Sequence, residues 1–188
     1  MASLSTHGFM RGSRYLGVAV FAAALLAPAA GPDEPRFTGD KELVRPEGYR
    51  EWVFVGSSLG LSYQEDQPRQ EPKFHNIYLK PSAYHHFQKT GEYPEGTILV
   101  MEIATPATQV SINRHGQFQD RFVGIESAVK DSSRFSEKWA YFSFIEQDGS
   151  AKKTAKAFAK DACWSCHNEH AAKDNVFSQF YPVLRHSE

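Results

Sequence analysis

Apolar runs separated by polar turns predict that much of the chain forms β-strands. The clearest run is 97–103, where β-branched and apolar residues follow one another. Residues 113–116 (Asn-Arg-His-Gly) separate two other runs and have the chemistry of a hairpin turn. Strands are therefore expected at 74–79, 97–103, 109–112, 117–125 and, within 136–145, at 139–144. A loop is expected at 57–72, and 49–55 could be a helix or a strand.

Helical signals occur in two parts of the chain. Ser82 is placed to cap a short helix over 83–89, which Gly91 would end. Near the C-terminus, apolar residues recur at helical spacing and predict a helix at 155–163. A second helix is expected at 176–181. Strands followed by helices indicate an α+β domain, an antiparallel β-sheet packed against α-helices.

The first 30 residues have the layout of a secretory signal peptide. Two arginines precede an apolar run at 18–26, and an Ala-rich cleavage region follows it. A membrane-spanning helix needs about 20 apolar residues, so this run is too short for an anchor. We expect residues 1–30 to be removed on export to the periplasm. Residues 31–46 would then form an N-terminal arm, and 47–188 the folded domain.

The charge balance argues against one class of partner. The 188 residues carry 21 Lys plus Arg and 22 Asp plus Glu, a formal net charge of −1, and no basic block occurs. Nucleic-acid binding is therefore not expected. Aromatic residues make up 13% of the chain, which is enough to build a core or to surround a large flat ligand.

Both cysteines of the sequence lie in one short motif, Cys163-Trp164-Ser165-Cys166-His167. A disulfide between them would close a loop too short to stabilise the chain much. Three chemistries remain open. C-x-x-C-H is the attachment signature of haem c, a redox dithiol needs only C-x-x-C, and a zinc site would need further ligands from scattered histidines.

Haem attachment is the interpretation that uses the cysteines and the histidine together. Two thiols three residues apart lie on one side of a helical turn, where they can reach the two vinyl groups of one porphyrin. His167 would then lie under the iron as an axial ligand. Export agrees with this interpretation, because haem is attached covalently outside the bacterial cytoplasm.

Other segments match a known pattern in order along the chain. They include Tyr49-Arg50-Glu51-Trp52-Val53, Lys89-Thr90-Gly91-Glu92, Gly124-Ile125-Glu126-Ser127-Ala128-Val129-Lys130-Asp131, Trp139-Ala140 and Phe180-Tyr181-Pro182-Val183-Leu184-Arg185. Together with the cysteine motif, they make the chain resemble the cytochrome P460 family, which includes the cytochromes c′-beta. The resemblance implies an antiparallel sheet packed on helices, a homodimer, and one five-coordinate c-type haem with its distal face against the sheet.

One position departs from the family pattern. The resemblance implies that, in cytochrome P460 proper, the strand that corresponds to the one after Gly96-Thr97 carries a lysine. That lysine is joined covalently to the porphyrin edge. Met101 stands at the matching position, and a thioether has no N–H with which to form that bond. We therefore expect no lysine cross-link through this position. Lys73 or Lys80 would replace it only if the register of the strands were shifted.

The resemblance also implies a distal pocket. Glu126 matches a carboxylate that moves protons, and burial would raise its pKa and suit it as a general base; we expect it to share a strand face with Phe122. Met101 is expected in the pocket wall, Phe74 as a cap on the distal face, and His75 as a hydrogen-bond donor to a bound ligand. Each could instead be an ordinary core or surface residue, and a shift of one residue would exchange Phe74 and His75 between the faces.

Two functions of different classes remain open. The first is a gas-binding haem protein like the cytochromes c′-beta, whose apolar distal wall favours a neutral ligand such as nitric oxide. The second is an oxidoreductase like cytochrome P460, which would oxidise hydroxylamine or nitric oxide to nitrous oxide or nitrite. Its electrons would pass to a redox partner cytochrome. Met101 in place of the lysine favours the first function, and Glu126 favours the second.

Overall fold

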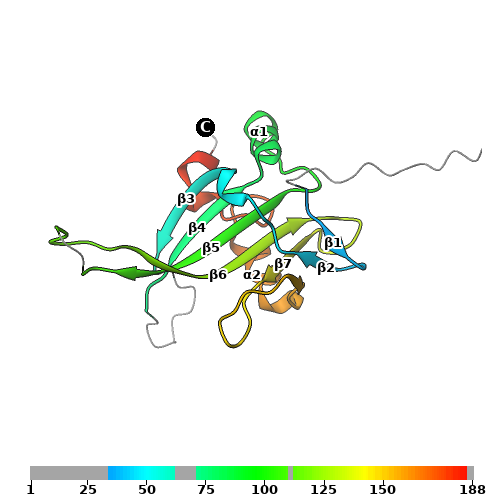
Figure 1. Cartoon of the computed structure of the whole chain (residues 1–188). Helices are drawn as coiled ribbons and strands as arrows, with labels where there is room; N and C mark the ends of the chain where they lie inside the picture. The colour runs from blue at the N-terminus through cyan, green and yellow to red at the C-terminus, as the bar shows by residue number, and fades with distance from the viewer. Residues whose placement is uncertain (1–33, 62–70, 110–111, 186–188) are drawn as a thin grey trace, which may run out of the picture.

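The computed structural model describes residues 34–61, 71–109 and 112–185, which form two antiparallel sheets and two α-helices (Figure 1). The larger sheet contains β3 (Val53–Leu59), β4 (Phe74–Leu79), β5 (Ile98–Ala107), β6 (Phe118–Lys130) and β7 (Trp139–Ser143). Each of these strands pairs with the next along the chain, so the sheet is a meander. The smaller sheet has the order β1-β2-β8, formed by β1 (Phe37–Thr38), β2 (Glu42–Val44) and β8 (Thr154–Lys156). The predicted α+β class is confirmed.

The helix α1 (Pro81–Thr90) connects β4 to β5. Pro81 occupies its first turn, where the missing N–H costs nothing and the fixed φ favours a helix. The helix therefore begins before Ser82, and the prediction that Ser82 caps it is wrong. It ends at Gly91 as predicted, and this glycine has a φ of 74°. No helix in the described ranges is long and apolar enough to cross a membrane.

The segment before the cysteines is less helical than predicted. Thr154–Lys156 is strand β8, and a single 3-10 turn, Lys160–Ala162, follows it. The α-helix α2 begins only at Trp164 and spans Trp164–His170, so the predicted helix at 155–163 is wrong. Pairing with β2 buries Ala155 in the same cluster as Leu43, and this tertiary packing outweighs the helical spacing of the sequence.

The predicted helix at 176–181 is also wrong. Two 3-10 turns, Ser178–Phe180 and Pro182–Leu184, stand in its place, and Tyr181 between them is extended, with φ −122° and ψ 108°. A residue that precedes a proline is driven away from the helical region by a steric clash with the proline ring. A helix therefore cannot continue through this point.

Three strand boundaries differ from the prediction. β3 reaches Leu59, inside the predicted loop at 57–72. β5 ends at Ala107, and neither residue 109 nor residue 112 is in a strand, while 110–111 lie outside the described residues. β6 continues to Lys130, beyond the predicted end of its strand at residue 125. The β5–β6 hairpin consequently extends well past the rest of the sheet (Figure 1).

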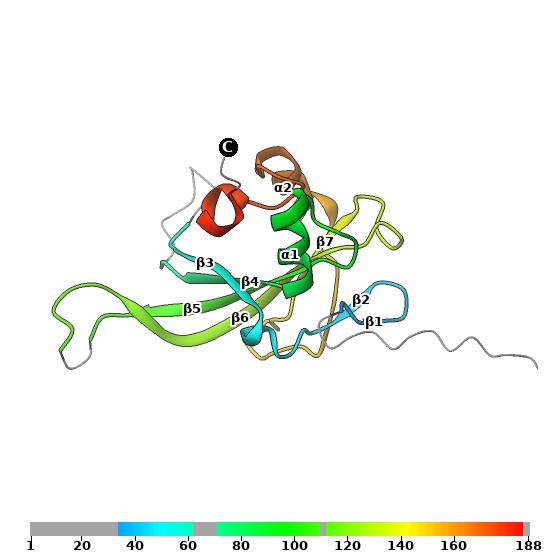
Figure 2. The same cartoon turned by 90° about the horizontal axis from the view of Figure 1, so that it is seen from above.

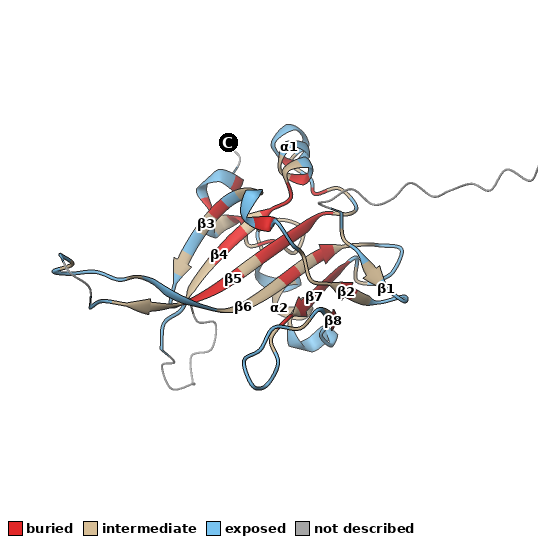
Figure 3. Cartoon of the chain, in the orientation of Figure 1, coloured by how far each residue is buried: buried red, intermediate tan, exposed pale blue. Residues whose placement is uncertain are grey.

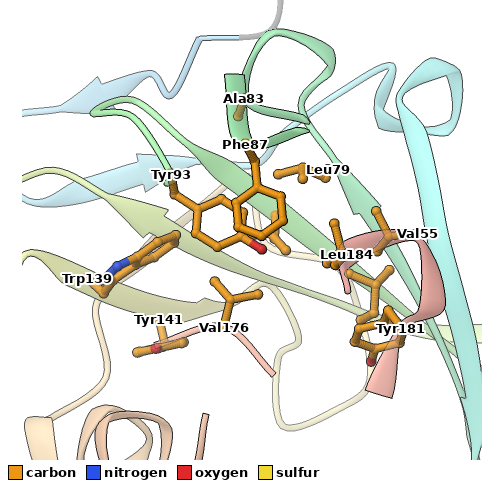
Figure 4. Packing of buried hydrophobic residues seen from close by; sticks show 12 residues of the cluster. Val55, Leu79, Ala83, Phe87, Tyr93, Trp139, Tyr141, Val176, Tyr181 and Leu184 are labelled. Carbon is orange, nitrogen blue, oxygen red and sulfur yellow. The ribbon is translucent and has the colours of Figure 1, made fainter. Parts of the chain in front are cut away.

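The central part of the larger sheet is buried on both faces. Its inner face carries Leu79, Leu99 and Tyr141 and is covered by α1, α2 and the C-terminal turns (Figures 2 and 4). Its outer face carries Val100 and Phe142 and packs against the smaller sheet (Figure 2). Burial on both faces explains why β5 is a continuous apolar run in the sequence, and Figure 3 shows its centre as buried.

The smaller sheet contains part of the predicted N-terminal arm. The predicted signal peptide, residues 1–30, lies outside the described residues, but β1 and β2 lie within the arm at 31–46. Leu43 of β2 has no solvent exposure and belongs to the outer cluster. These residues therefore form part of the folded structure rather than a loose extension.

Leu43→Ala tests how much this packing contributes. We expect it to lower the free energy of unfolding by about 2–5 kcal/mol, because it leaves a cavity in a closed core. Urea denaturation of the purified protein measures the change. Leu59→Ala is the matched control, since Leu59 is 40% exposed, and its expected loss is below about 1 kcal/mol. Equal losses in the two variants would contradict the assignment of β2 to the core.

Candidate functional site

A cavity of about 260 Å³ lies between the inner face of the larger sheet and the segment 158–181. The sheet contributes two rows of paired residues, the first across β4, β5 and β6 and the second across β5, β6 and β7. They are Ile77, Met101 and Glu126, and next to them Leu99, Ala128 and Tyr141. The opposite wall includes Cys163, His167, Asn175, Val176 and Phe177. Two other hollows in the described part of the chain contain neither cysteine nor histidine.

The cavity brings together most of the residues singled out in the sequence. Met101, Glu126, His75, Cys163 and His167 all line it. They come from three strands, from α2 and from the residue that precedes α2, so the fold assembles the site from distant parts of the chain.

Two of the predicted residues do not line the cavity. Phe74 lies outside it, so the expectation that Phe74 caps a distal face is wrong. Successive residues of a strand point to opposite faces, and β4 turns His75 and Ile77 to the inner face. Cys166 lies one turn into α2 and is half-buried, while Cys163, at the start of the helix, contributes to the wall.

A bulge in β6 changes the surroundings of Glu126. Gly124 pairs with Ile103 but Phe122 pairs with the adjacent Ala104, so β6 has one extra residue here. Phe122 is therefore turned to the outer face, and the expectation that it shares a face with Glu126 is wrong. Phe122 is 57% exposed there, and the guanidinium of Arg50 lies 4.6 Å from its ring centroid.

Gly124 itself stays on the inner face and permits a close contact. A Cβ at this position would lie 2.3 Å from Cδ1 of Ile145. The same Cβ would lie 3.4 Å from Cδ1 of Ile103. A larger residue at position 124 would therefore force the side chain of Ile145 to move.

His167 is held in a defined orientation. Its Nδ1 lies 2.9 Å from the carbonyl oxygen of Asn175, so Nδ1–H donates and Nε2 keeps its lone pair. Its ring lies between Tyr141 and Phe177, with centroid distances of 4.3 and 4.5 Å. Burial lowers the pKa of His167, although the bond to Asn175 opposes this shift. The lowered pKa favours the neutral imidazole, in which Nε2 is the nitrogen suited to bind a metal.

Asn175 is the main residue of the site that the sequence analysis missed. Its carbonyl accepts hydrogen bonds from His167 and, at 3.2 Å, from the hydroxyl of Tyr141. The available signal was the pair Asp174-Asn175, since these two residue types favour tight turns with positive φ. A backbone carbonyl has no signature in the sequence, so its role becomes apparent only in the structure.

The cysteines do not have the environment of a redox dithiol. Burial, aided by the charges of Glu126 and Cys166, raises the pKa of the Cys163 thiol to about 11. Redox cysteines instead have lowered pKa values, because the thiolate is the reactive form. For the zinc alternative, no group of three or more His, Cys, Asp or Glu side chains suited to a metal ion occurs in the described residues.

The cavity also contains charged and polar groups that have few partners. Burial raises the pKa of Glu126, while a hydrogen bond with Ser143 opposes the shift. Burial, together with the charge of Lys73, lowers the pKa of His75. Ser58 Oγ and Asn175 Nδ2 are buried without hydrogen-bond partners among the described residues, and both residues line the cavity. A bound group with polar substituents would satisfy them.

A family model described as Cytochrome P460 matches residues 46–178. The chain belongs to the cytochrome P460 family. The match includes the whole larger sheet, the cysteine motif and the Asp174-Asn175 turn. A search of curated proteins found no match.

Membership of the cytochrome P460 family makes this protein a cytochrome with haem and iron. The residues of the cavity fit that group. An apolar wall around Leu99 and Met101 suits a flat porphyrin, and His167 presents a free nitrogen suited to iron. The unpartnered atoms of Ser58 and Asn175 suit the polar substituents of a haem.

Proposed function

We propose that the protein is a periplasmic mono-haem cytochrome c that binds nitric oxide, or another small ligand, in the cavity. Cys163 and Cys166 would hold the porphyrin through thioethers, and His167 Nε2 would bind the iron. The haem would supply an iron with one open coordination position. The free Nε2 of His167 and the neutral thiol of Cys163 in one cavity support this assignment.

The observation that favours binding over oxidation is the side chain of Met101. It lies in the inner row between Ile77 and Glu126, on the cavity wall. The family resemblance implies the cross-linking lysine at this position. A thioether cannot form the amine bond, and it leaves this part of the wall apolar. An apolar wall favours a small neutral diatomic over water, so binding of nitric oxide is the function that the site supports best.

Glu126 supports the alternative, an oxidoreductase that acts on hydroxylamine or nitric oxide. A buried carboxyl group with a raised pKa on the cavity wall is suited to accept a proton from a bound substrate. Electrons would leave through a partner cytochrome. We also propose that the protein is a homodimer, as the family resemblance implies, and analytical ultracentrifugation measures this directly.

The two functions differ in their response to Glu126→Gln. If binding is the function, nitric oxide affinity changes little in the variant, and neither protein oxidises hydroxylamine with an electron acceptor. Anaerobic stopped-flow spectroscopy measures the binding, and nitrite and nitrous oxide assays measure turnover. Robust turnover in the unchanged protein, reduced about 10²–10⁴-fold in Glu126→Gln, would overturn the proposal in favour of the enzyme.

The pH dependence would identify Glu126 as the base in that second case. Because the folded protein raises the pKa of Glu126, its proton-accepting form appears only above the ordinary range of a glutamate. Turnover would then rise with pH through this raised pKa, and Glu126→Gln would remove the rise.

A further inference from the structure

The carbonyl that holds His167 belongs to an unusual turn. Asp174 and Asn175 have φ values of 44° and 60°, and Lys173 and Val176 pair across them. The left-handed region is unfavourable for residues with a Cβ, by about 1–2 kcal/mol each, although Asp and Asn tolerate it best. Such a conformation persists only where surrounding contacts hold it.

Asp174 supplies those contacts. Its Oδ2 accepts a hydrogen bond of 2.7 Å from Lys130 Nζ, and its Oδ1 accepts one of 3.1 Å from Trp139 Nε1. Lys130 also donates to the carbonyl oxygen of Tyr93, at 2.7 Å. The ion pair is largely shielded, since the Lys130 and Asp174 side chains are 14% and 28% exposed. Asp174 therefore ties the turn to the ends of two strands, β6 and β7.

The other residue of the turn acts directly on the imidazole. Asp174 and Asn175 are adjacent in one turn, so the hydrogen bonds that hold the Asp174 carboxylate also restrict the orientation of the Asn175 carbonyl. That carbonyl receives Nδ1–H of His167 at 2.9 Å and the hydroxyl of Tyr141 at 3.2 Å. The chain of contacts thus runs from Lys130 and Trp139 through the turn to His167.

We propose that Asp174 is a positioning residue that sets how strongly His167 binds the haem iron. This inference rests on the proposed function, in which His167 Nε2 is the axial ligand. A firm Nδ1–H···O bond raises the basicity of the imidazole and so favours ferric over ferrous iron. Without its carboxylate the turn relaxes, the bond to Asn175 weakens, and the reduction potential rises.

Asp174→Ala tests the inference in the haem-containing protein. Partners of a metal-bound histidine typically contribute about tenfold or more to metal affinity. A loss of affinity that is tenfold larger in the ferric than in the ferrous state raises a one-electron potential by about 59 mV. We expect a shift of this order in a spectroelectrochemical titration, with a lower iron–imidazole stretching frequency in the resonance Raman spectrum of the ferrous protein. Lys130→Met is expected to shift both in the same direction.

Asp131→Asn is the matched control. The Asp131 side chain forms an ion pair with Arg134 and accepts backbone N–H groups of Ser133 and Arg134. Among the described residues its side chain has no hydrogen bond to His167 or to the Asp174-Asn175 turn. Its loss should lower the melting temperature without moving the potential or the stretching frequency. If Asp174→Ala does not fold, Asp174→Asn replaces it. The amide keeps an acceptor for Trp139 and removes the charge that faces Lys130. We expect the reduction potential and the stretching frequency to shift in the same direction as in Asp174→Ala, but by less.

A potential and a stretching frequency equal to those of the unchanged protein, with a loss of thermal stability alone, would overturn the inference. That outcome would make Asp174 merely structural. Failure of the part of the proposed function on which the inference rests, a haem bound by His167, is distinguishable, since the unchanged protein would then lack a histidine-ligated haem spectrum before any variant is compared.

Discussion

The double variant Cys163→Ala, Cys166→Ala is expected to lose its haem on denaturation, whereas the unchanged protein keeps it. Thioethers survive heat and detergent, but a haem held only by His167 and by packing is released when the cavity opens. Haem staining of a denaturing gel measures the difference, and we expect the signal to fall to background. This is the largest chemical change expected from any substitution in the chain.

Ser165→Ala is the control, because Ser165 lies between the cysteines and carries no thiol. Its haem stain should equal that of the unchanged protein. Persistent staining of the double variant would contradict covalent attachment through the motif. The haem-bearing peptide of the unchanged protein should have the mass of the peptide plus one haem attached through two thioethers. A mass that requires a further covalent bond would contradict the expectation that Met101 leaves the porphyrin without a cross-link.

His167→Ala is expected to remove the axial nitrogen completely while the thioethers keep the haem in place. The substitution leaves a space between the rings of Tyr141 and Phe177, which are 4.3 and 4.5 Å from the imidazole centroid in the native structure. Free imidazole fits this space, so adding it should restore the ferrous absorption spectrum of the unchanged protein. Absorption spectroscopy with and without imidazole makes the measurement.

His170→Ala is the matched control for the axial ligand. His170 lies on the same helix, three residues later, and its side chain is 59% exposed beside Glu169. Its removal should leave the spectrum unchanged, with no response to imidazole. A ligand role for His170, or an unaltered spectrum in His167→Ala, would show that the axial assignment is wrong.

The sequence predicted the strands well where local composition decides the structure. β4 has the predicted bounds, and the apolar run of β5 is unambiguous because both of its faces are buried. The helix at 155–163 failed because β8 pairs with β2, more than a hundred residues earlier, which local spacing cannot reveal. Local sequence also could not predict that the carboxylate of Glu102 is buried, because its partners Tyr49 and Arg50 lie about 50 residues earlier in the chain.

The parts of the site that are formed by residues adjacent in the sequence could be predicted. The motif that contains Cys163 and His167 is contiguous, so its interpretation as a haem-attachment signature needs the spacing alone. Strand register decides that His75, and not Phe74, points to the cavity side of β4. A single extra residue in β6 decides that Phe122 points to the outer face. The contact of His167 with Asn175 depends on a turn that the pair Asp174-Asn175 favours, but the direction of the Asn175 carbonyl depends on how that turn packs.

The pairing of β2 with β8 has a consequence for maturation. It closes a loop of about 110 residues, and such distant pairings form after the local hairpins of the meander. In a chain that is exported and attaches haem, as proposed above, β2 would emerge first and then wait for β8, so the two thiols just beyond β8 would stay accessible to an attachment apparatus until this last step. Pulsed thiol labelling during refolding would show the order, and early protection of Cys163 would contradict it. The short pairing of β2 with β8 would thus determine how long the cysteines remain available for haem attachment.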